Sequence, residues 1–232
     1  MKRTVLVTRP EPGLGETMRA VAAMGFTPLA TPMLRIVPLK PALPARVQAV
    51  LFTSGQAVGP LADQAPLLLG ATVLSVGDAT AERARDAGFT RVASARGDAK
   101  ALASLAARRL DPAAGSLLLA CGRGQGGELV EGLRSRGFRV LKRCVYQAVA
   151  ARALDETVLA RLRSGRVEAV LFFSGETAVA FERAVPPDLS LDGVRALAIS
   201  AKAASRLSEG CWRSVSFAET PDAAALLALL QQ

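Results

Sequence analysis

The sequence repeats itself in four blocks that keep their order along the chain, and this repeat limits the possible folds more than any other feature. The similar segments are Thr4–Leu29 with Leu117–Leu141, Val50–Val58 with Val170–Val179, Ser75–Phe89 with Ala198–Trp212, and Gly97–Ala99 with Pro221–Ala223. Within the second pair, Phe52 and Ser54 align with Phe172 and Ser174. Four ordered blocks, each repeated about 110 to 125 residues further on, predict two related domains of about 110 residues.

Each block combines a short apolar run with a longer stretch of helical pattern. The apolar runs are Thr4–Thr8, Ala49–Thr53, Thr72–Val76, Ser116–Cys121, Ala169–Phe173, Val194–Ile199 and Ser214–Ala218. They are rich in Val, Leu and Phe and do not alternate with polar residues, as is typical of parallel strands covered on both faces. The helical stretches are Glu16–Met24, Ala79–Ala87, Ala99–Leu110, Glu128–Arg136, Thr177–Ala184 and Asp222–Leu230. This alternation predicts an α/β fold of two similar doubly wound, flavodoxin-like parallel-sheet lobes.

Two extended stretches fall outside the repeat, at residues 32–39 and 140–149. Each follows a copy of the same first block, so we expect both to be linker strands. An antiparallel pair of linkers would form a hinge, with a cleft between the two lobes and a variable angle across it.

The chain of 232 residues contains no histidine. This excludes Ser-His-Asp and Cys-His nucleophiles and histidine-ligated metals, and it removes the usual acid–base residue at neutral pH. Any catalysis must therefore use carboxylates, hydroxyls, a phenol, cations or backbone dipoles. The three cysteines, Cys121, Cys144 and Cys211, are far apart and form no CxxC motif, so we expect neither a zinc site nor a dithiol site.

The same cysteines indicate the compartment, since scattered free thiols fit a reducing cytosol. Only five residues separate Arg3 from Arg9, and this stretch is too short for the apolar core of a signal segment. No apolar run approaches the ~18 residues of a membrane helix. We therefore expect a cytoplasmic protein with no membrane attachment.

The net charge of +9 suggests an anionic partner. Basic residues are dispersed singly along the chain, and aromatic residues make up only 4% of it, so no stacking platform for nucleic acid is recognisable. A small polyanionic ligand fits at least as well as nucleic acid, which is supported by the charge alone. The alternative is that the solvated helix faces simply carry more Arg than Glu.

Candidate binding residues come directly after the apolar runs, because ligands of doubly wound sheets bind beyond the carboxyl ends of the strands. Serine or threonine caps, small residues and free N–H groups at these turns favour anionic ligands. The alternative is ordinary helix capping, which nearly every α/β protein shows. The candidate substrate-binding residues are Arg9, Ser54, Gly55, Thr80, Ala81, Gly122, Arg123, Ser174, Gly175, Thr177, Ser200 and Lys202.

Two further features bear on chemistry. Gly122, Gly124 and Gly127 match the GxGxxG pattern of dinucleotide sites, but the expected acidic residue about 20 positions later is missing. We therefore expect no NAD or FAD. Tyr146 is the only tyrosine, and its phenol can donate a proton without histidine. The alternative for Tyr146 is a half-buried strand residue.

Taken together, these segments resemble the uroporphyrinogen-III synthase family over essentially the whole chain. The resemblance lies in Val7–Pro10, Leu51–Ser54, Val76–Ala81, Val145–Tyr146, Leu171–Ser174, Ala198–Ser200 and Pro221–Ala223. It implies two α/β lobes joined by a two-stranded ladder. Lobe 1 would be discontinuous and contain residues 1–36 plus 148–232, and lobe 2 would contain residues 40–143.

The resemblance also implies a lyase of heme biosynthesis that closes hydroxymethylbilane into uroporphyrinogen III, inverting ring D through a spiro intermediate. The substrate is a linear tetrapyrrole with eight carboxylates, and the family needs no metal or organic cofactor. Tyr146 falls on the tyrosine thought to assist loss of the hydroxyl group. The turns listed above would hold the acetates and propionates, largely through backbone N–H groups.

One departure from the family lies at Ser200–Ala201–Lys202, where a glycine followed by a threonine-containing turn is usual, so the role of that threonine does not carry over. The runner-up function is a non-catalytic, cytoplasmic two-lobed binding protein for a small polyanion. Under both hypotheses we expect a monomer with no nucleic-acid partner.

Overall fold

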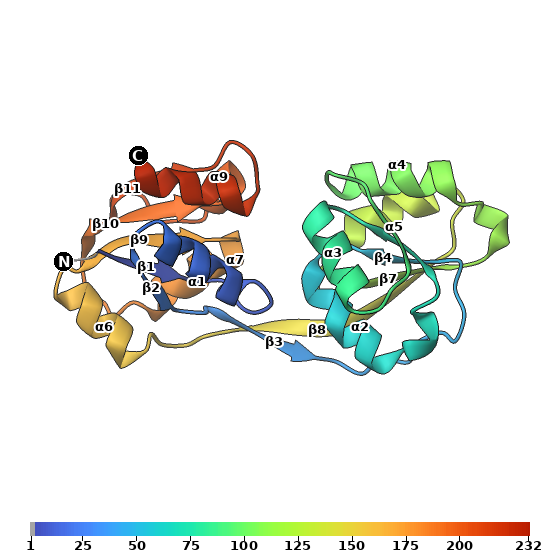
Figure 1. Cartoon of the computed structure of the whole chain (residues 1–232), viewed down its shortest axis with the longest axis horizontal. Helices are drawn as coiled ribbons and strands as arrows, with labels where there is room; N and C mark the ends of the chain where they lie inside the picture. Colours follow the sequence, from blue (N-terminus) through green and yellow to red (C-terminus); the bar gives the residue numbers. More distant parts are fainter. Residues whose placement is uncertain (1–2) are drawn as a thin grey trace. The chain divides into compact units, whose positions relative to one another are not determined.

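The computed structural model describes residues 3–232, and the chain divides into two compact units. Unit 1 holds residues 1–35 and 149–232, and unit 2 holds residues 36–148 (Figure 1). The chain passes between the units within two strands, β3 (Leu34–Pro38) and β8 (Val140–Ala150), which are neighbours in one sheet.

The strands β3 and β8 are antiparallel. The amide of Leu39 donates to the carbonyl of Val145 at 2.8 Å, and the amide of Ala151 donates to the carbonyl of Met33 at 2.9 Å. Residue numbers thus rise along one strand as they fall along the other. The remaining strand pairs described below are parallel.

Unit 1 is a five-stranded parallel sheet in the order β11-β10-β9-β1-β2. Its strands are β1 (Thr4–Val7), β2 (Thr27–Ala30), β9 (Val167–Phe172), β10 (Leu191–Ala198) and β11 (Trp212–Phe217). Its helices are α1 (Leu14–Ala23), α6 (Glu156–Arg163), α7 (Gly175–Ala184), α8 (Ala201–Ala204) and α9 (Ala223–Ala228), followed by a 3-10 turn η4 (Leu229–Gln231). Numbered within the unit, this is the 2-1-3-4-5 order of flavodoxin-like sheets.

Unit 2 is a six-stranded sheet in the order β3-β8-β7-β4-β5-β6. Besides the two linker strands, it contains β4 (Ala49–Phe52), β5 (Thr72–Ser75), β6 (Arg91–Ser94) and β7 (Leu117–Gly122). Its helices are α2 (Val58–Gln64), α3 (Asp78–Asp86), α4 (Ala99–Arg109) and α5 (Gly127–Arg134), with 3-10 turns η1 (Gly55–Ala57), η2 (Pro66–Leu68) and η3 (Pro112–Ala114).

The repeat in the sequence corresponds to equivalent places in the two sheets. The strands β2, β1, β9, β10 and β11 of unit 1 match β8, β7, β4, β5 and β6 of unit 2, in that order. The first block is exchanged, because β1, α1 and β2 from the start of the chain complete the sheet built from its second half. The predicted fold class, parallel sheets in a doubly wound α/β arrangement, is confirmed.

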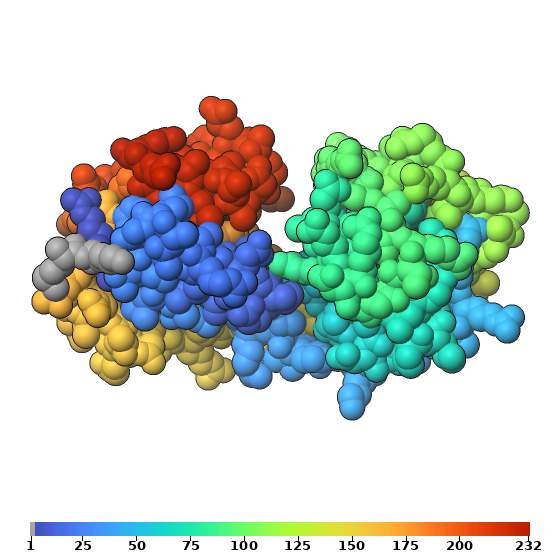
Figure 2. Space-filling model, viewed as in Figure 1, coloured from blue at the N-terminus to red at the C-terminus, as the bar shows by residue number. Residues whose placement is uncertain are grey.

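Helices cover both faces of each sheet. In unit 1, α1 and α9 pack on one face against Val5, Val7 and Leu171, and the atoms of these helices cover that face in Figure 2. Helices α6, α7 and α8 pack on the opposite face. In unit 2, α4 and α5 cover one face, and α2 and α3 cover the other.

An aromatic pair packs at the same place in both units. The rings of Phe52 and Phe89 meet edge to face at 5.7 Å between centroids, and those of Phe172 and Trp212 do so at the same distance. The four residues are aligned pairwise by the sequence repeat. Burial of such rings stabilises the sheet–helix interface that positions the turns at the strand ends. Within residues 3–232, no helix is both long and apolar enough to span a membrane.

Candidate functional site

The topology gives each unit one position where a ligand can enter between strands. In a doubly wound sheet this position lies outside the carboxyl ends of two neighbouring strands whose following helices pack on opposite faces. In unit 1 the strands are β1 and β9, because α1 and α7 lie on opposite faces. In unit 2 they are β7 and β4, which are followed by α5 and α2.

In unit 2, Tyr146 lies beside the carboxyl end of β7, on the side away from β4. It stands in β8 opposite Gly122, the last residue of β7, and its side chain is only 2% exposed. The phenol Oη donates a hydrogen bond to Oε1 of Gln125 at 3.0 Å. The amide of Arg123 donates to the carbonyl of Tyr146 at 3.0 Å, so the turn after β7 is bound to both the side chain and the backbone of this residue.

Gly122 is required for this packing. A Cβ atom at Gly122 would lie 2.7 Å from Cζ of Tyr146 and 2.9 Å from Oε1 of Gln125, closer than van der Waals contact allows. Gly122, the first glycine of the GxGxxG pattern, therefore has a local role, since it makes room for the tyrosine ring.

The remaining predicted residues of unit 2 follow β4 and β5. Ser54 caps η1, accepting a hydrogen bond from the amide of Gln56 at 3.3 Å, and Gly55 is buried. Thr80 and Ala81 lie in the first turn of α3 and are also buried. The amide of Ala81 donates to the carbonyl of Gly77 at 3.1 Å, so this N–H group already has a hydrogen-bond acceptor within the protein.

In unit 1, Arg9 follows β1 and lies over the ring of Phe173, which follows β9, with its Cζ atom 4.3 Å from the ring centroid. Its Nη1 donates to Oγ1 of Thr17 at 3.2 Å. This cation–π contact crosses the position between β1 and β9 where the topology places a ligand.

The turns after β9 and β10 begin helices. Ser174 caps α7, accepting from the amide of Thr177 at 3.2 Å, while Oγ1 of Thr177 donates to the carbonyl of Ser174 at 2.8 Å. Ser200 caps the single turn of α8, accepting from the amide of Ala203 at 3.2 Å. Lys202 is exposed in that turn.

The structure thus divides the predicted residues between the units. Unit 2 brings together Gly122, Arg123 and Tyr146 and holds Ser54, Gly55, Thr80 and Ala81 at its other strand ends; unit 1 holds Arg9, Ser174, Gly175, Thr177, Ser200 and Lys202. Gln125, the partner of Tyr146, was missed. No spacing rule links a residue in a turn to a strand residue 21 positions later, so the sequence carries no signal for it.

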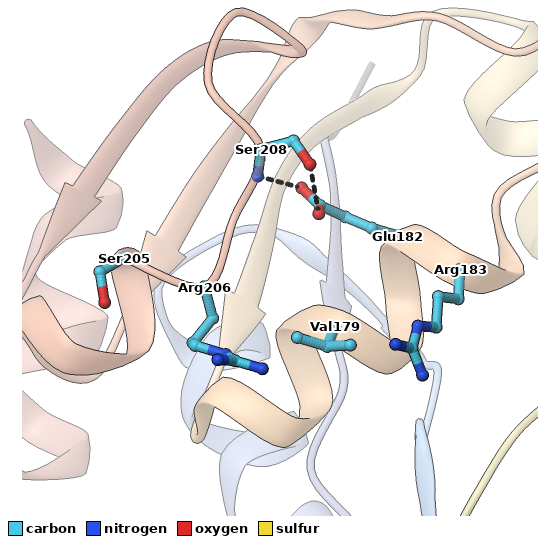
Figure 3. A pocket seen from close by; sticks show the side chains of 6 residues that line it. All are labelled: Val179, Glu182, Arg183, Ser205, Arg206 and Ser208. Carbon is cyan, nitrogen blue, oxygen red and sulfur yellow. Dashed lines mark hydrogen bonds between the residues drawn. The ribbon is translucent and has the colours of Figure 1, made fainter.

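A hollow in unit 1 has a volume of about 470 Å³ and lies against α7. Its lining residues are Val179, Glu182, Arg183, Ser205, Arg206 and Ser208 (Figure 3). Glu182 turns away from the arginines, since its carboxylate accepts hydrogen bonds from the amide and Oγ of Ser208, both at 2.9 Å, and from Nε1 of Trp212 at 2.9 Å. None of the residues predicted from the sequence lines this hollow, but Arg206 reaches from it to Gly175 at the start of α7.

The cysteine next to Gly122 does not provide a thiolate nucleophile. Burial raises the pKa of the Cys121 thiol to about 11, so this side chain next to Gly122 stays protonated at neutral pH. No group of three or more His, Cys, Asp or Glu side chains that could hold a metal ion occurs in the described part of the chain.

Comparison with known proteins identifies similar chains. Residues 15–228 match the family described as uroporphyrinogen-III synthase HemD. The crystal structure of uroporphyrinogen-III synthetase from Helicobacter pylori superimposes with a TM-score of 0.67 at 20% identity, covering 100% of this chain and 99% of that one. A mutant uroporphyrinogen III synthase from the extremely thermophilic bacterium Thermus thermophilus gives a TM-score of 0.57 at 23% identity, covering 99% and 96%. No curated protein matches the chain at a significant level.

Proposed function

Since this chain belongs to the uroporphyrinogen-III synthase family, we propose that Tyr146 is its catalytic residue and that the turns at the strand ends of each unit bind its substrate. The activity of the chain is that of a lyase in heme biosynthesis, which cyclises hydroxymethylbilane to uroporphyrinogen III with inversion of ring D. The observation that carries the assignment of the site is the single tyrosine, held by Gln125 at the carboxyl end of β7.

Tyr146 acts as the acid in this proposal. The C–O bond of the substrate's hydroxymethyl group breaks as Oη delivers its proton to the leaving hydroxyl, which departs as water. The electron pair of the pyrrole system forms the azafulvenium cation. Attack of the substituted carbon of ring D on this cation gives the spiro intermediate, which fragments and recloses at the unsubstituted carbon of ring D. That carbon then loses its proton, which restores the phenol and leaves water and the macrocycle as the products. A phenol suits this step because the reaction needs a weak acid and a chain without histidine offers no imidazole.

The strand-end turns hold the substrate's carboxylates. In unit 2 these are Ser54, Gly55, Thr80, Ala81, Gly122 and Arg123, and in unit 1 they are Arg9, Ser174, Gly175, Thr177, Ser200 and Lys202. The net charge of +9 supports a ligand with many acidic groups. The serine hydroxyls already accept hydrogen bonds as helix caps, so most direct contacts would come from backbone N–H groups.

We also propose that the two units correspond to the two lobes of the family, residues 1–36 plus 148–232 and residues 40–143, with 32–39 and 140–149 as linker strands. Cys121, Cys144 and Cys211 are free thiols, which supports a cytoplasmic location. A monomer without nucleic-acid or membrane partners completes the proposal, and sedimentation of the purified protein tests the monomer.

The assay for the function uses freshly prepared hydroxymethylbilane, oxidation of the products, and chromatographic separation of the porphyrin isomers. Spontaneous closure gives isomer I, whereas the enzyme gives isomer III. A non-catalytic binding protein for polyanions, the alternative, would bind the substrate and leave isomer I as the product.

A further inference from the structure

The repeat places an arginine against a glycine at the same point of each unit. In unit 2, a Cβ atom at Gly55 would lie 2.5 Å from Nη1 of Arg83 and 3.3 Å from its Cζ. In unit 1, a Cβ atom at Gly175 would lie 2.7 Å from Cγ of Arg206. An arginine side chain thus packs against each glycine, in the space that a Cβ atom would fill. The guanidinium of Arg83 makes this contact in unit 2, and the aliphatic stem of Arg206 makes it in unit 1.

The two contacts are equivalent in sequence and in topology. Gly55 and Gly175 directly follow the aligned serines Ser54 and Ser174, which end the turns after β4 and β9. Arg83 and Arg206 are each the ninth residue of the aligned segments Ser75–Phe89 and Ala198–Trp212. The same glycine–arginine pair therefore occurs twice in one chain, each time beside the strand ends where the topology places a ligand.

Neither guanidinium is neutralised by the protein. Within residues 3–232, ion pairs join Arg3 and Arg195 to Glu168 and Arg96 to Asp78, but Arg83 and Arg206 have no carboxylate or hydrogen-bond partner. The nearby Glu182 is engaged by Ser208 and Trp212. The hollow lined by Arg183 and Arg206 is cationic for this reason (Figure 3).

We propose that Arg83 and Arg206 are equivalent carboxylate-binding residues, one in each unit, that hold acidic side chains of the tetrapyrrole. This rests on the proposed function and names residues that the sequence prediction did not include. A guanidinium presents a planar fork of donors that matches a carboxylate bidentately, which a backbone turn alone does not. Gly55 allows the fork of Arg83 to lie against the strand-end turn, and Gly175 allows the stem of Arg206 to do so in unit 1.

The test uses Arg83→Gln and Arg206→Gln, because glutamine removes the charge and keeps much of the stem that packs on the glycine. Each variant should raise KM about tenfold and change kcat less than twofold, as expected for the loss of one charge-assisted contact. The double variant should raise KM about 100-fold, since the two arginines belong to different units and the costs of the two substitutions should add. Lysine at either position should recover part of the loss.

Two exposed arginines serve as matched controls. Arg85 lies on the same helix as Arg83, and Arg213 lies on β11 of unit 1. Arg85→Gln and Arg213→Gln remove the same charge and should leave KM within twofold of the parent. A second readout is the Kd of uroporphyrin III, the stable oxidised product, measured by fluorescence, which should weaken in parallel with KM.

Thermal unfolding followed by circular dichroism confirms that each variant is folded. If KM and the Kd of uroporphyrin III stay within twofold of the parent in either folded variant, or if the control variants lose as much affinity, the proposal is overturned. That result is distinct from failure of the proposed function, in which the unmodified protein itself would yield no isomer III.

Discussion

The phenol of Tyr146 donates a hydrogen bond to the side-chain carbonyl of Gln125 at 3.0 Å, and this bond fixes the only tyrosine of the chain at the end of β7. Gln125 lies in the turn between β7 and α5, whereas Tyr146 lies within the neighbouring strand β8. The phenol is almost fully buried. In the proposed function, its hydroxyl exchanges the amide oxygen of Gln125 for the leaving group of the substrate.

Replacing Tyr146 with phenylalanine should lower kcat roughly 100-fold, at the low end of the effect of a general acid. The effect is at the low end because spontaneous closure shows that the hydroxyl can leave unassisted. KM should change little, since the ring keeps its place against Gly122. Steady-state rates of isomer III formation measure this, and unchanged turnover would remove Tyr146 from the mechanism.

Replacing Gln125 with leucine should lower kcat about tenfold while the phenol remains present. The expected reason is loss of orientation, because Oη no longer has its amide acceptor. The Tyr146→Phe/Gln125→Leu double variant should be no slower than Tyr146→Phe alone, since Gln125 acts only through the phenol. Fully multiplicative losses in kcat would instead indicate an independent role for Gln125.

Replacing Gly122 with alanine should destabilise the protein by about 1–3 kcal/mol, because the new methyl group would collide with the ring of Tyr146. Displacement of that ring should also lower kcat. Gly127→Ala is the matched control in the same turn, since nothing lies within 4 Å of a Cβ there and alanine favours the helix. Urea unfolding of both variants measures the difference, and equal stability of the two would contradict the packing argument.

The elements that the sequence predicted share strong local signals. All seven apolar runs form strands of the two sheets. Six of these strands are largely buried, as expected for continuous Val, Leu and Phe residues, but the edge strand β11 exposes Val215 and Phe217, so the expected cover on both faces is wrong there. The strands that sequence reasoning missed, β2 and β6, lie at sheet edges, where TPLA and RVAS are only partly buried and carry no long apolar run. Helix α2 was missed because its sequence, VGPLADQ, contains both glycine and proline near its start.

Sequence reasoning could predict the site residues that follow strands, but not the contacts between distant residues. Helix-capping serines such as Ser54 and Ser174 can be read from sequence, because a cap directly follows its strand. The contacts of Tyr146 with Gln125 and of Gly55 with Arg83 join residues more than 20 positions apart, and only the fold brings them together. The repeat did contain a signal for Arg83, since it aligns with Arg206, but alignment alone does not reveal that both lie on glycines.

The last prediction concerns the two aspartates that begin the final helix of each repeat. Asp98 accepts a hydrogen bond from the amide of Ala101 at 2.9 Å and Asp222 accepts one from that of Ala225 at 2.8 Å, and these backbone hydrogen bonds lower the pKa of both carboxyls. A carboxyl whose pKa is lower in the folded than in the unfolded state stabilises the fold at pH values above the unfolded pKa of 3.8. This stabilisation is lost as the pH falls through the folded pKa.

Asp98→Ala and Asp222→Ala should therefore lower Tm at pH 7, and the difference in Tm from the parent should shrink below pH 4. Asp86→Ala, at the other end of a helix, is the control; a Tm difference for the capping variants that persists unchanged at low pH would show that the carboxylate charge plays no part.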